Sequence, residues 1–213
     1  MFTGIVQELA AVVSMSQQEG ITRLEIAISD EGRAGLAGGA SVAINGTCLT
    51  VARQTAAAVG FDVIAETLNR SNLGRLAVGH KVNVERSATF ADEIGGHRVS
   101  GHVTTTAQIT SIAADEANRV MRFAVEPEWL RMLFHKGYVA LDGASLTISA
   151  VDREASWIEV SLIPETLART TLGFRRVGDE VNLEVDAQTQ AVVETVERLF
   201  QDATWRRQVM PSG

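Results

Sequence analysis

The chain contains nearly the same seven-residue phrase twice, as NGTCLTV at residues 45–51 and as DGASLTI at residues 142–148. The first copy contains Cys48 where the second contains Ser145, so the two phrases are 97 residues apart. Self-similarity at a fixed spacing indicates repetition of a structural unit, and a unit of this length is the size of a domain.

Three further blocks repeat in the same order along the chain: TGIV at 3–6 with SGHV at 100–103, ETLNRSNLG at 66–74 with ETLARTTLG at 165–173, and VGHKVNVE at 78–85 with VGDEVNLE at 177–184. The spacing changes from 97 to 99 residues between Thr147 and Glu165, as a two-residue insertion in a hairpin loop would produce. Four matched blocks predict a tandem duplication, and the period is too long for a solenoid repeat.

Both units show the alternation of apolar and polar residues that is typical of half-buried β-strands. In the first unit the alternating apolar residues are Leu24, Ile26 and Ile28, and then Phe61, Val63 and Ala65. In the second unit they are Met121, Phe123, Val125, Ile158, Val160, Leu162, Val181, Leu183 and Val185. Many short strands at close spacing predict a small closed barrel or a sandwich in each unit.

Two segments have a helical pattern instead. Residues 126–137 contain Pro127, which suits a first helical turn, and Gly137, which suits a helix end, so we expect a short helix across a barrel end. Residues 189–200 form an unrepeated amphipathic helix with an apolar face made by Val192, Val196, Leu199 and Phe200. An oligomer contact is the expected use of this helix, and packing on its own barrel is the alternative. The loop over 85–102 is a candidate linker between the units.

The composition excludes several classes of function. The net charge is −7, and no run of Lys or Arg is dense enough to neutralise a line of phosphates, so nucleic acid is a poor partner. The first twenty residues do not resemble a signal peptide, and no stretch has the ~20 apolar residues of a membrane helix. The single cysteine fits a reducing compartment, so we expect a cytoplasmic protein without membrane association.

The common motifs for cofactors and catalysis are absent from the sequence. There is no dinucleotide-binding glycine motif, no phosphate-binding loop, no zinc-protease motif and no nucleophile elbow. The four histidines, at positions 80, 97, 102 and 135, are too scattered to predict a zinc site with one cysteine. Hydrolases and metalloenzymes are therefore disfavoured.

The positions at which the two copies disagree are the most informative about function. Between the first copy and the second, the residue type changes from Ile5 to His102, from Cys48 to Ser145 and from Asn45 to Asp142. Drift on a duplicated structural barrel would explain any one of these changes. The alternative is that two equivalent pockets hold the same ligand in different chemical roles. Gly4 and Gly101 would let the backbone approach a flat ligand closely.

The sequence resembles the riboflavin synthase family. The motifs that carry the resemblance extend from residue 1 to about residue 199: MFTGIV, NGTCLTV, DEIGGH, SGHV, DGASLTI, IPETLARTTLG and DAQTQAVVETVERL. The resemblance implies an all-β fold of two tandem, homologous, six-stranded Greek-key β-barrels followed by a C-terminal α-helix that gathers three subunits. We expect barrels over 1–96 and 97–186 and an oligomerisation helix and tail over 187–213.

The resemblance also implies a reaction. Two molecules of 6,7-dimethyl-8-(1-D-ribityl)lumazine would exchange a four-carbon unit, giving riboflavin and 5-amino-6-(D-ribitylamino)uracil, with no metal and no redox coenzyme. One lumazine would bind each barrel, and the productive pair would form where barrels of neighbouring subunits face each other. Partners implied are the substrate, riboflavin, two further copies of the chain and lumazine synthase.

Matching the family motifs to this sequence gives two predicted pockets. The first contains Gly4, Ile5, Val6, Cys48, Leu49, Thr50, Asp62, Val63, Ile64, Ala65, Glu66 and Thr67. The second contains Gly101, His102, Val103, Lys136, Ser145, Leu146, Thr147, Ser161, Leu162, Ile163, Pro164, Glu165 and Thr166.

Five residues are candidates for the chemistry. His102 is the first candidate for proton transfer, since an imidazole can accept and return a proton near neutral pH, and its alternative role is hydrogen bonding in the pocket. Cys48 could add to the acceptor ring or orient a water, or it could be a small buried apolar group. Ser41, Ser145 and His97 are supporting candidates, and His97 could instead only order the linker.

Two other classes of function compete with the enzyme. A non-catalytic lumazine- or flavin-binding fluorescent protein needs only one good pocket, whereas here SGHV, SLTI and PETL are intact in the second copy. A purely structural duplicated barrel leaves Cys48 and His102 without a role.

Overall fold

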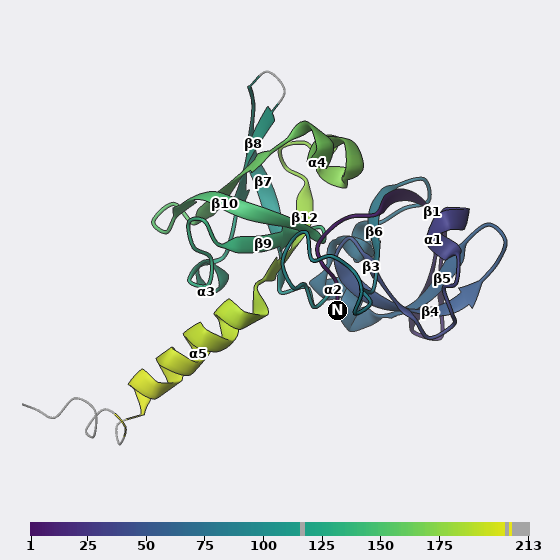
Figure 1. Ribbon diagram of the computed structural model, residues 1–213, viewed down its shortest axis with the longest axis horizontal. Helices are drawn as coiled ribbons and strands as arrows, with labels where there is room; N and C mark the ends of the chain where they lie inside the picture. Colours follow the sequence, from purple (N-terminus) through teal and green to yellow (C-terminus); the bar gives the residue numbers. More distant parts are fainter. Residues whose placement is uncertain (116–117, 203–204, 206–213) are drawn as a thin grey trace, which may run out of the picture.

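The computed structural model describes residues 1–115, 118–202 and 205 of the chain. Two closed six-stranded antiparallel barrels lie side by side, and helix α5 extends away from the second barrel (Figure 1). The predicted all-β fold of two barrels followed by a C-terminal helix is confirmed. The tail residues 203–204 and 206–213 of the predicted segment 187–213 lie outside the described residues.

The two barrels have the same topology. The strands of the first barrel are β1 (Glu8–Gln18), β2 (Ile21–Ala27), β3 (Ser41–Ile44), β4 (Thr47–Gln54), β5 (Val59–Ile64) and β6 (Lys81–Arg86). The strands of the second are β7 (Thr105–Asp115), β8 (Asn118–Ala124), β9 (Tyr138–Leu141), β10 (Ala144–Asp152), β11 (Trp157–Leu162) and β12 (Glu180–Val185). The order β1-β2-β5-β4-β3-β6 is Greek-key-like, and every strand of the second barrel has the neighbours of its counterpart in the first.

The helices are short, except for the last. They are α1 (Asp30–Arg33), α2 (Ala65–Arg70), α3 (Pro127–Leu130), α4 (Pro164–Arg169) and α5 (Ala187–Gln201), with 3-10 turns η1 (Asn72–Arg75) and η2 (Thr171–Gly173). Helices α2 and α4 follow β5 and β11 directly, so the repeated ETL motif closes the same end of each barrel.

The alternating apolar residues fill the barrel interiors as predicted. Leu24, Ile26 and Phe61 are fully buried in the first barrel, and Phe123 and Leu183 are fully buried in the second. Burial of each such side chain contributes about 1.5–3 kcal/mol to folding, so the alternation dominates the choice of fold. One position differs from the pattern: residue 65 is exposed, because the chain turns there from β5 into α2.

The helix expected over 126–137 is shorter than predicted. Pro127 occupies the first turn, but α3 ends at Leu130, well before Gly137. Met132 and Leu133, which follow the helix, are both buried in the core of the second barrel.

Helix α5 begins at the second barrel and leaves it. The side chain of Asp186 caps the helix by accepting a hydrogen bond from the backbone N–H of Thr189 at 2.8 Å. An ion pair between Arg131 and Glu197 holds one side of the helix on the loop after α3. The predicted apolar face is solvent-exposed along much of its length, where Val192, Val196 and Phe200 are 63%, 44% and 47% exposed.

A buried polar network joins the barrels about a pseudo-two-fold axis. The Nδ2 of Asn83 donates to the backbone carbonyl of Asp142 at 2.8 Å. In the equivalent bond the Nδ2 of Asn182 donates to the backbone carbonyl of Asn45, also at 2.8 Å. The symmetry ends at one side chain. The fully buried carboxylate of Asp142 accepts a charged hydrogen bond from Arg175 Nη2 at 2.7 Å, whereas the side chain of Asn45 bonds to Asn72 and Asn83, which are both neutral.

Two further side chains complete this network. Asn72, in η1 of the first barrel, donates through Nδ2 to Asp142 Oδ1 at 2.7 Å. Thr171, its counterpart in η2, donates through Oγ1 to Asp142 Oδ2 of its own barrel at 3.1 Å, and its backbone N–H donates to Asn83 Oδ1 of the first barrel at 2.8 Å. The repeated turns after α2 and α4 therefore pack against the partner barrel, which fixes how the two barrels lie relative to each other.

Among the described residues, none of the helices has the length and apolar content needed to cross a lipid bilayer.

Candidate functional site

The repeated phrase forms one strand on the wall of each barrel. In β4, Leu49 is buried in the barrel, and the alternation of side chains turns Cys48 and Thr50 to the outer face. Strand β10 repeats this arrangement, with Leu146 buried and Ser145 and Thr147 on the outer face. We call these surfaces the first and the second outer face.

Two short segments lie across these outer faces. Residues 2–6 form the first strap, and residues 99–103 form the second strap. The two straps pair with each other, because the N–H of Phe2 donates to the carbonyl of Val99 at 2.8 Å and the N–H of Val99 donates to the carbonyl of Phe2 at 3.0 Å. Both side chains are buried in a small core with Ala43 and Ala140 between the barrels.

Each strap covers the outer face of the other unit. The backbone N–H of Cys48, in the first barrel, donates to the carbonyl of Gly101 at 2.8 Å. The backbone N–H of Ser145, in the second barrel, donates to the carbonyl of Gly4 at 2.8 Å. Val6 of the first strap packs into the core of the second barrel. Each outer face is therefore built from both copies of the repeat.

The strap contacts explain the two repeated glycines. An added Cβ on Gly101 would lie 2.5 Å from the Cβ of Cys48, and an added Cβ on Gly4 would lie 2.5 Å from the Cβ of Ser145. Both glycines also have positive φ, at 84° and 75°. The sequence predicts a close approach of the backbone at Gly4 and Gly101 to a flat ligand. In the structure it approaches Ser145 of β10 and Cys48 of β4 instead.

The remaining residues of the first predicted pocket lie on or beside the first outer face. Ser41 of β3 pairs with Thr50 of β4. In the segment from β5 into α2, the buried residue is Val63 and the exposed ones are Asp62, Ile64, Ala65 and Glu66, while Thr67 is half-buried. Ile5 and Val6 differ from this group, because the first strap carries them to the second barrel.

The second outer face brings together Ser145 and His97. The Oγ of Ser145 lies 2.6 Å from the Nδ1 of His97, and the imidazole stacks on the ring of Tyr138 at 5.1 Å between centroids. The Nε2 of His97 is buried and has no hydrogen-bond partner among the described residues. Burial lowers the pKa of His97, and the nearby charge of Asp186 opposes that shift in part. The linker histidine is thus part of the face as well as of the linker.

The other residues of the second predicted pocket divide between the two faces. Leu162 is buried, and the positions around it lie on or next to the second outer face: Ser161, Ile163, Pro164, Glu165 and Thr166. Lys136 is exposed and lies at the turn into β9, with its backbone N–H bonded to the carbonyl of Ile148. Gly101, His102 and Val103 belong to the second strap, so Gly101 contacts the first outer face.

Three residues that motif matching did not select also shape the faces. Tyr138 stacks on His97, and the sequence signal for it was its pairing position opposite the repeated phrase. Glu85 and Glu184 are buried and bind the first and the second strap respectively. Burial raises the pKa of both carboxyls, and hydrogen bonds from the straps oppose the shift. These glutamates end the repeated VNVE and VNLE blocks, which was the available signal.

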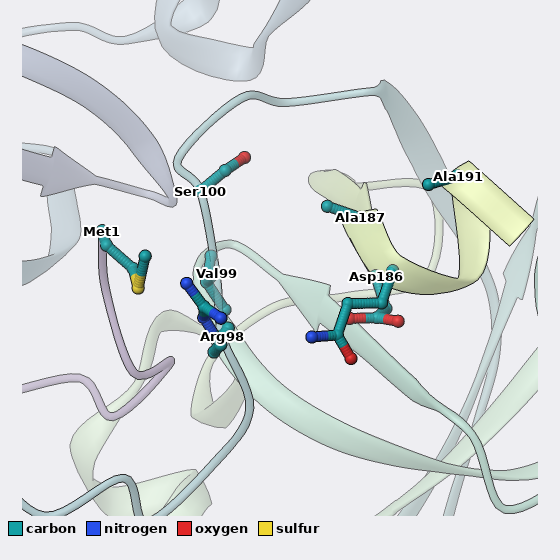
Figure 2. A pocket seen from close by; sticks show the side chains of 8 residues that line it. Met1, Arg98, Val99, Ser100, Asp186, Ala187 and Ala191 are labelled. Atoms are coloured by element: carbon teal, nitrogen blue, oxygen red, sulfur yellow. The ribbon is translucent and has the colours of Figure 1, made fainter.

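A cavity of about 310 Å³ lies beside the second strap at the start of α5 (Figure 2). Met1 lies on one side of it, and Ala187 and Ala191 of α5 lie on the other, with Arg98 and Ser100 between them. Among the described residues, no cluster of three or more His, Cys, Asp or Glu side chains is suited to bind a metal ion.

Both barrels with their exchanged straps match the same known protein family. The family described as the lumazine binding domain matches residues 3–87 and 100–186, one match for each barrel. The crystal structure of LumP complexed with riboflavin has a TM-score of 0.79 and 25% identity to this chain, covering 87% of this chain and 100% of LumP. LumP complexed with 6,7-dimethyl-8-(1'-D-ribityl) lumazine gives a TM-score of 0.78 at 23% identity, which bears on the fold alone.

Curated relatives narrow the class further. Riboflavin synthase of Escherichia coli (strain K12) is 48% identical over 201 residues, which is 94% of this chain and 93% of the relative. Riboflavin synthase of Mycobacterium tuberculosis (strain ATCC 25618 / H37Rv) is 43% identical over 209 residues, which is 95% of this chain and 100% of the relative. The chain belongs to the riboflavin synthase family and is an enzyme of the transferase type.

Proposed function

We propose that the chain forms riboflavin from two molecules of 6,7-dimethyl-8-ribityllumazine, one bound at each outer face. The observation that carries this proposal is the pair of equivalent faces, in which Cys48 and Ser145 lie under straps with the same hydrogen bonds. The complexes of LumP with riboflavin and with the lumazine support a ligand of this class on this fold. Residues 1–96 and 97–186 are the two proposed binding units.

The proposed reaction is balanced without an added reagent. One lumazine donates a four-carbon unit to the other, so the acceptor becomes riboflavin and the donor becomes 5-amino-6-ribitylaminouracil. The C7 methyl of the lumazine is acidified by the conjugated ring, so a carbon nucleophile forms by loss of a proton. Alignment of two rings can supply an effective concentration of up to ~10⁵ to 10⁸ M, while a positioned base typically adds ~10² to 10⁴-fold. Alignment of the rings is therefore the larger proposed contribution.

The candidate catalytic residues take different positions in this scheme. His102 follows the glycine whose carbonyl contacts Cys48, which supports proton transfer by His102 at the first outer face. Cys48 is proposed to add to the acceptor ring or to orient a water. Ser145 and His97 form a pair whose Oγ and Nδ1 atoms lie 2.6 Å apart, so a proton can pass between the hydroxyl and the imidazole at the second outer face. Ser41 supports Thr50 across the β3–β4 pair.

An anaerobic assay tests the proposal directly. We expect the purified chain to form one riboflavin for every two lumazines consumed, with no added coenzyme. Calorimetric titration with riboflavin should give two sites for each chain. A single site and no turnover would indicate a carrier of the LumP kind and overturn the enzymatic proposal.

Replacement of His102 tests its role. We expect His102→Gln to lower kcat by about 10²-fold, the usual contribution of a positioned acid or base, with little change in lumazine binding. His80→Gln is the matched control, because His80 is exposed in the turn before β6. Wild-type turnover in His102→Gln would remove His102 from proton transfer.

We further propose that α5 assembles three chains, so that barrels of neighbouring subunits bring two bound lumazines together. The exposed Val192, Val196 and Phe200 on α5 support this proposal, because apolar side chains on one exposed helix face gain stability when covered. Light scattering should give three times the chain mass, and Val196→Glu should reduce it. We also propose a cytoplasmic location, because the single cysteine fits a reducing compartment. An association with lumazine synthase is a further part of the proposal, and co-purification of the two proteins would test it.

A further inference from the structure

Each strap is bound by one buried glutamate of its own unit. Glu184 of β12 is 5% exposed, and its Oε1 accepts hydrogen bonds from the backbone N–H of Ser100 at 2.6 Å and from the Ser100 hydroxyl at 2.8 Å. The second carboxylate oxygen, Oε2, accepts from the N–H of Gly101 at 3.0 Å. Three donors converge on one carboxylate, so its position fixes the backbone of the second strap.

Glu85 of β6 repeats this arrangement for the first strap. Its Oε1 accepts from the N–H and the hydroxyl of Thr3 at 2.6 and 2.8 Å, and its Oε2 accepts from the N–H of Gly4 at 3.1 Å. Glu85 is 4% exposed. The two glutamates are therefore a matched pair with almost identical hydrogen bonds.

The two straps differ in the residue that follows the glycine. In the second strap the N–H of His102 donates to the Ser100 hydroxyl at 3.1 Å, which completes a chain of hydrogen bonds from Glu184 to His102. In the first strap the same bond, at 3.3 Å, is made by the N–H of Ile5 to the Thr3 hydroxyl. Only one of the two glutamates thus holds a strap with an ionisable residue at this position.

The second strap, which Glu184 holds, is hydrogen-bonded to the first barrel. Glu184 belongs to the second barrel, whereas the carbonyl of Gly101 accepts its hydrogen bond from Cys48 of the first barrel. The charge of His102 acts on the Glu184 carboxyl as the smallest of the influences that lower its pKa, against the rise that burial causes. Displacement of Glu184 would therefore alter the first outer face.

We propose that Glu184 is a positioning residue for His102, holding it against the first outer face through Ser100 and Gly101, while Glu85 holds Ile5 against the second outer face. This inference rests on the proposed function for its kinetic consequence. The positional part is independent of that function, since it concerns a hydrogen bond between two backbone groups.

Two matched variants test the positional part by amide hydrogen exchange. Glutamine offers one oxygen and replaces the other with an N–H₂ group, which faces a donor and loses that bond. We expect Glu184→Gln to speed exchange of the Cys48 amide by about tenfold or more and to leave the Ser145 amide unchanged, because a loosened strap opens locally. Glu85→Gln should do the reverse. Unchanged exchange at Cys48 in Glu184→Gln would overturn the proposal.

A double-mutant cycle tests the kinetic part. We expect Glu184→Gln to lower kcat about tenfold with a smaller change in KM, and to lower it little further when His102→Gln is already present, because residues that act through one another are not additive. Glu85→Gln should raise KM and keep the pH dependence of kcat. Fully additive losses for Glu184→Gln and His102→Gln would overturn the positioning role.

The outcomes separate this inference from the proposed function. If exchange at Cys48 responds to Glu184→Gln while His102→Gln keeps full turnover, the positioning stands and the proton-transfer role of His102 fails. If Glu184→Gln does not fold, Ser100→Ala removes only the hydroxyl between Glu184 and His102, with Thr3→Ala as its control. Ser100→Ala should then speed exchange at Cys48 but not at Ser145, and equal exchange at both would overturn the proposal.

Discussion

The two barrels share a strand order, a strap and a buried glutamate, yet they carry different chemical groups on their outer faces. The first face has Cys48 next to the strap that contains His102, and the second has Ser145 bonded to His97. Because each strap crosses to the other barrel, a substitution in one copy of the repeat changes the face of the other. Duplication here produced two unlike outer faces from one scaffold, and neither face is complete within one copy.

The interface between the barrels shows the same mixture of symmetry and difference. Asn83 and Asn182 make equivalent bonds across it, but Asp142 occupies the position of Asn45 and brings Arg175 with it. A charge on only one side of a pseudo-two-fold axis should make the two halves of the network unequal in energy.

The largest expected effect breaks this network on its charged side. Asp142→Ala removes the acceptor for Arg175 and for three other donors, and we expect it to lower the free energy of unfolding by about 3 to 5 kcal/mol. Asn45→Ala, the equivalent change on the neutral side, should cost about 1 to 3 kcal/mol. Urea denaturation at neutral pH measures both, and equal costs would contradict an unequal network.

The next effect concerns the crossing of the straps. Gly101→Ala places a Cβ 2.5 Å from the Cys48 Cβ, and we expect a loss of about 2 to 4 kcal/mol together with lower turnover. Gly20→Ala is the control, because Gly20 has a similar φ of 81° with no atom within 4 Å of an added Cβ. Its cost should be about 1 to 2 kcal/mol, from backbone conformation alone. Thermal unfolding of the two variants isolates the strap contact.

The smallest expected effect is on the pH dependence of stability, and it comes from His97, which lies on the second outer face only. Burial lowers the pKa of His97 in the folded state, so below an unfolded value of about 6.5 the unfolded chain binds more protons and stability falls as the pH falls. The stability that the buried, neutral His97 contributes is fully present above the unfolded-state pKa of about 6.5. We expect the wild type to lose more stability than His97→Gln between pH 8 and pH 5.5, by denaturant unfolding at each pH. Parallel losses in the two proteins would remove His97 as the source.

The fold could be predicted from the sequence because alternation reports which side of a strand is buried. Leu49 and Leu146 are buried while their neighbours in the repeated phrase face outwards, as a period of two requires. A short helix after Pro127 was predicted, but its end at Leu130 could not be, because Pro127 and Gly137 mark possible ends without showing how the residues between them pack.

The sequence did not predict which residues would meet on each outer face. The repeat relates Gly4 to Gly101 and Cys48 to Ser145 by the same spacing, and that relation holds whether each strap stays on its own barrel or crosses to the other. Only the bonds between Gly101 and Cys48, and between Gly4 and Ser145, decide the question. The contact of His97 with Ser145 likewise depends on the path of the linker rather than on any local pattern.

The exchange of straps also determines when, during protein synthesis, each outer face can be covered. A ribosome releases the strands of the first barrel before it releases Gly101, so the first outer face, which contains Cys48, is at first not covered by the second strap. The first strap waits longer still, because its acceptor strand contains Ser145. The first half can therefore reach its final form only after Gly101 and Ser145 of the second half have been made.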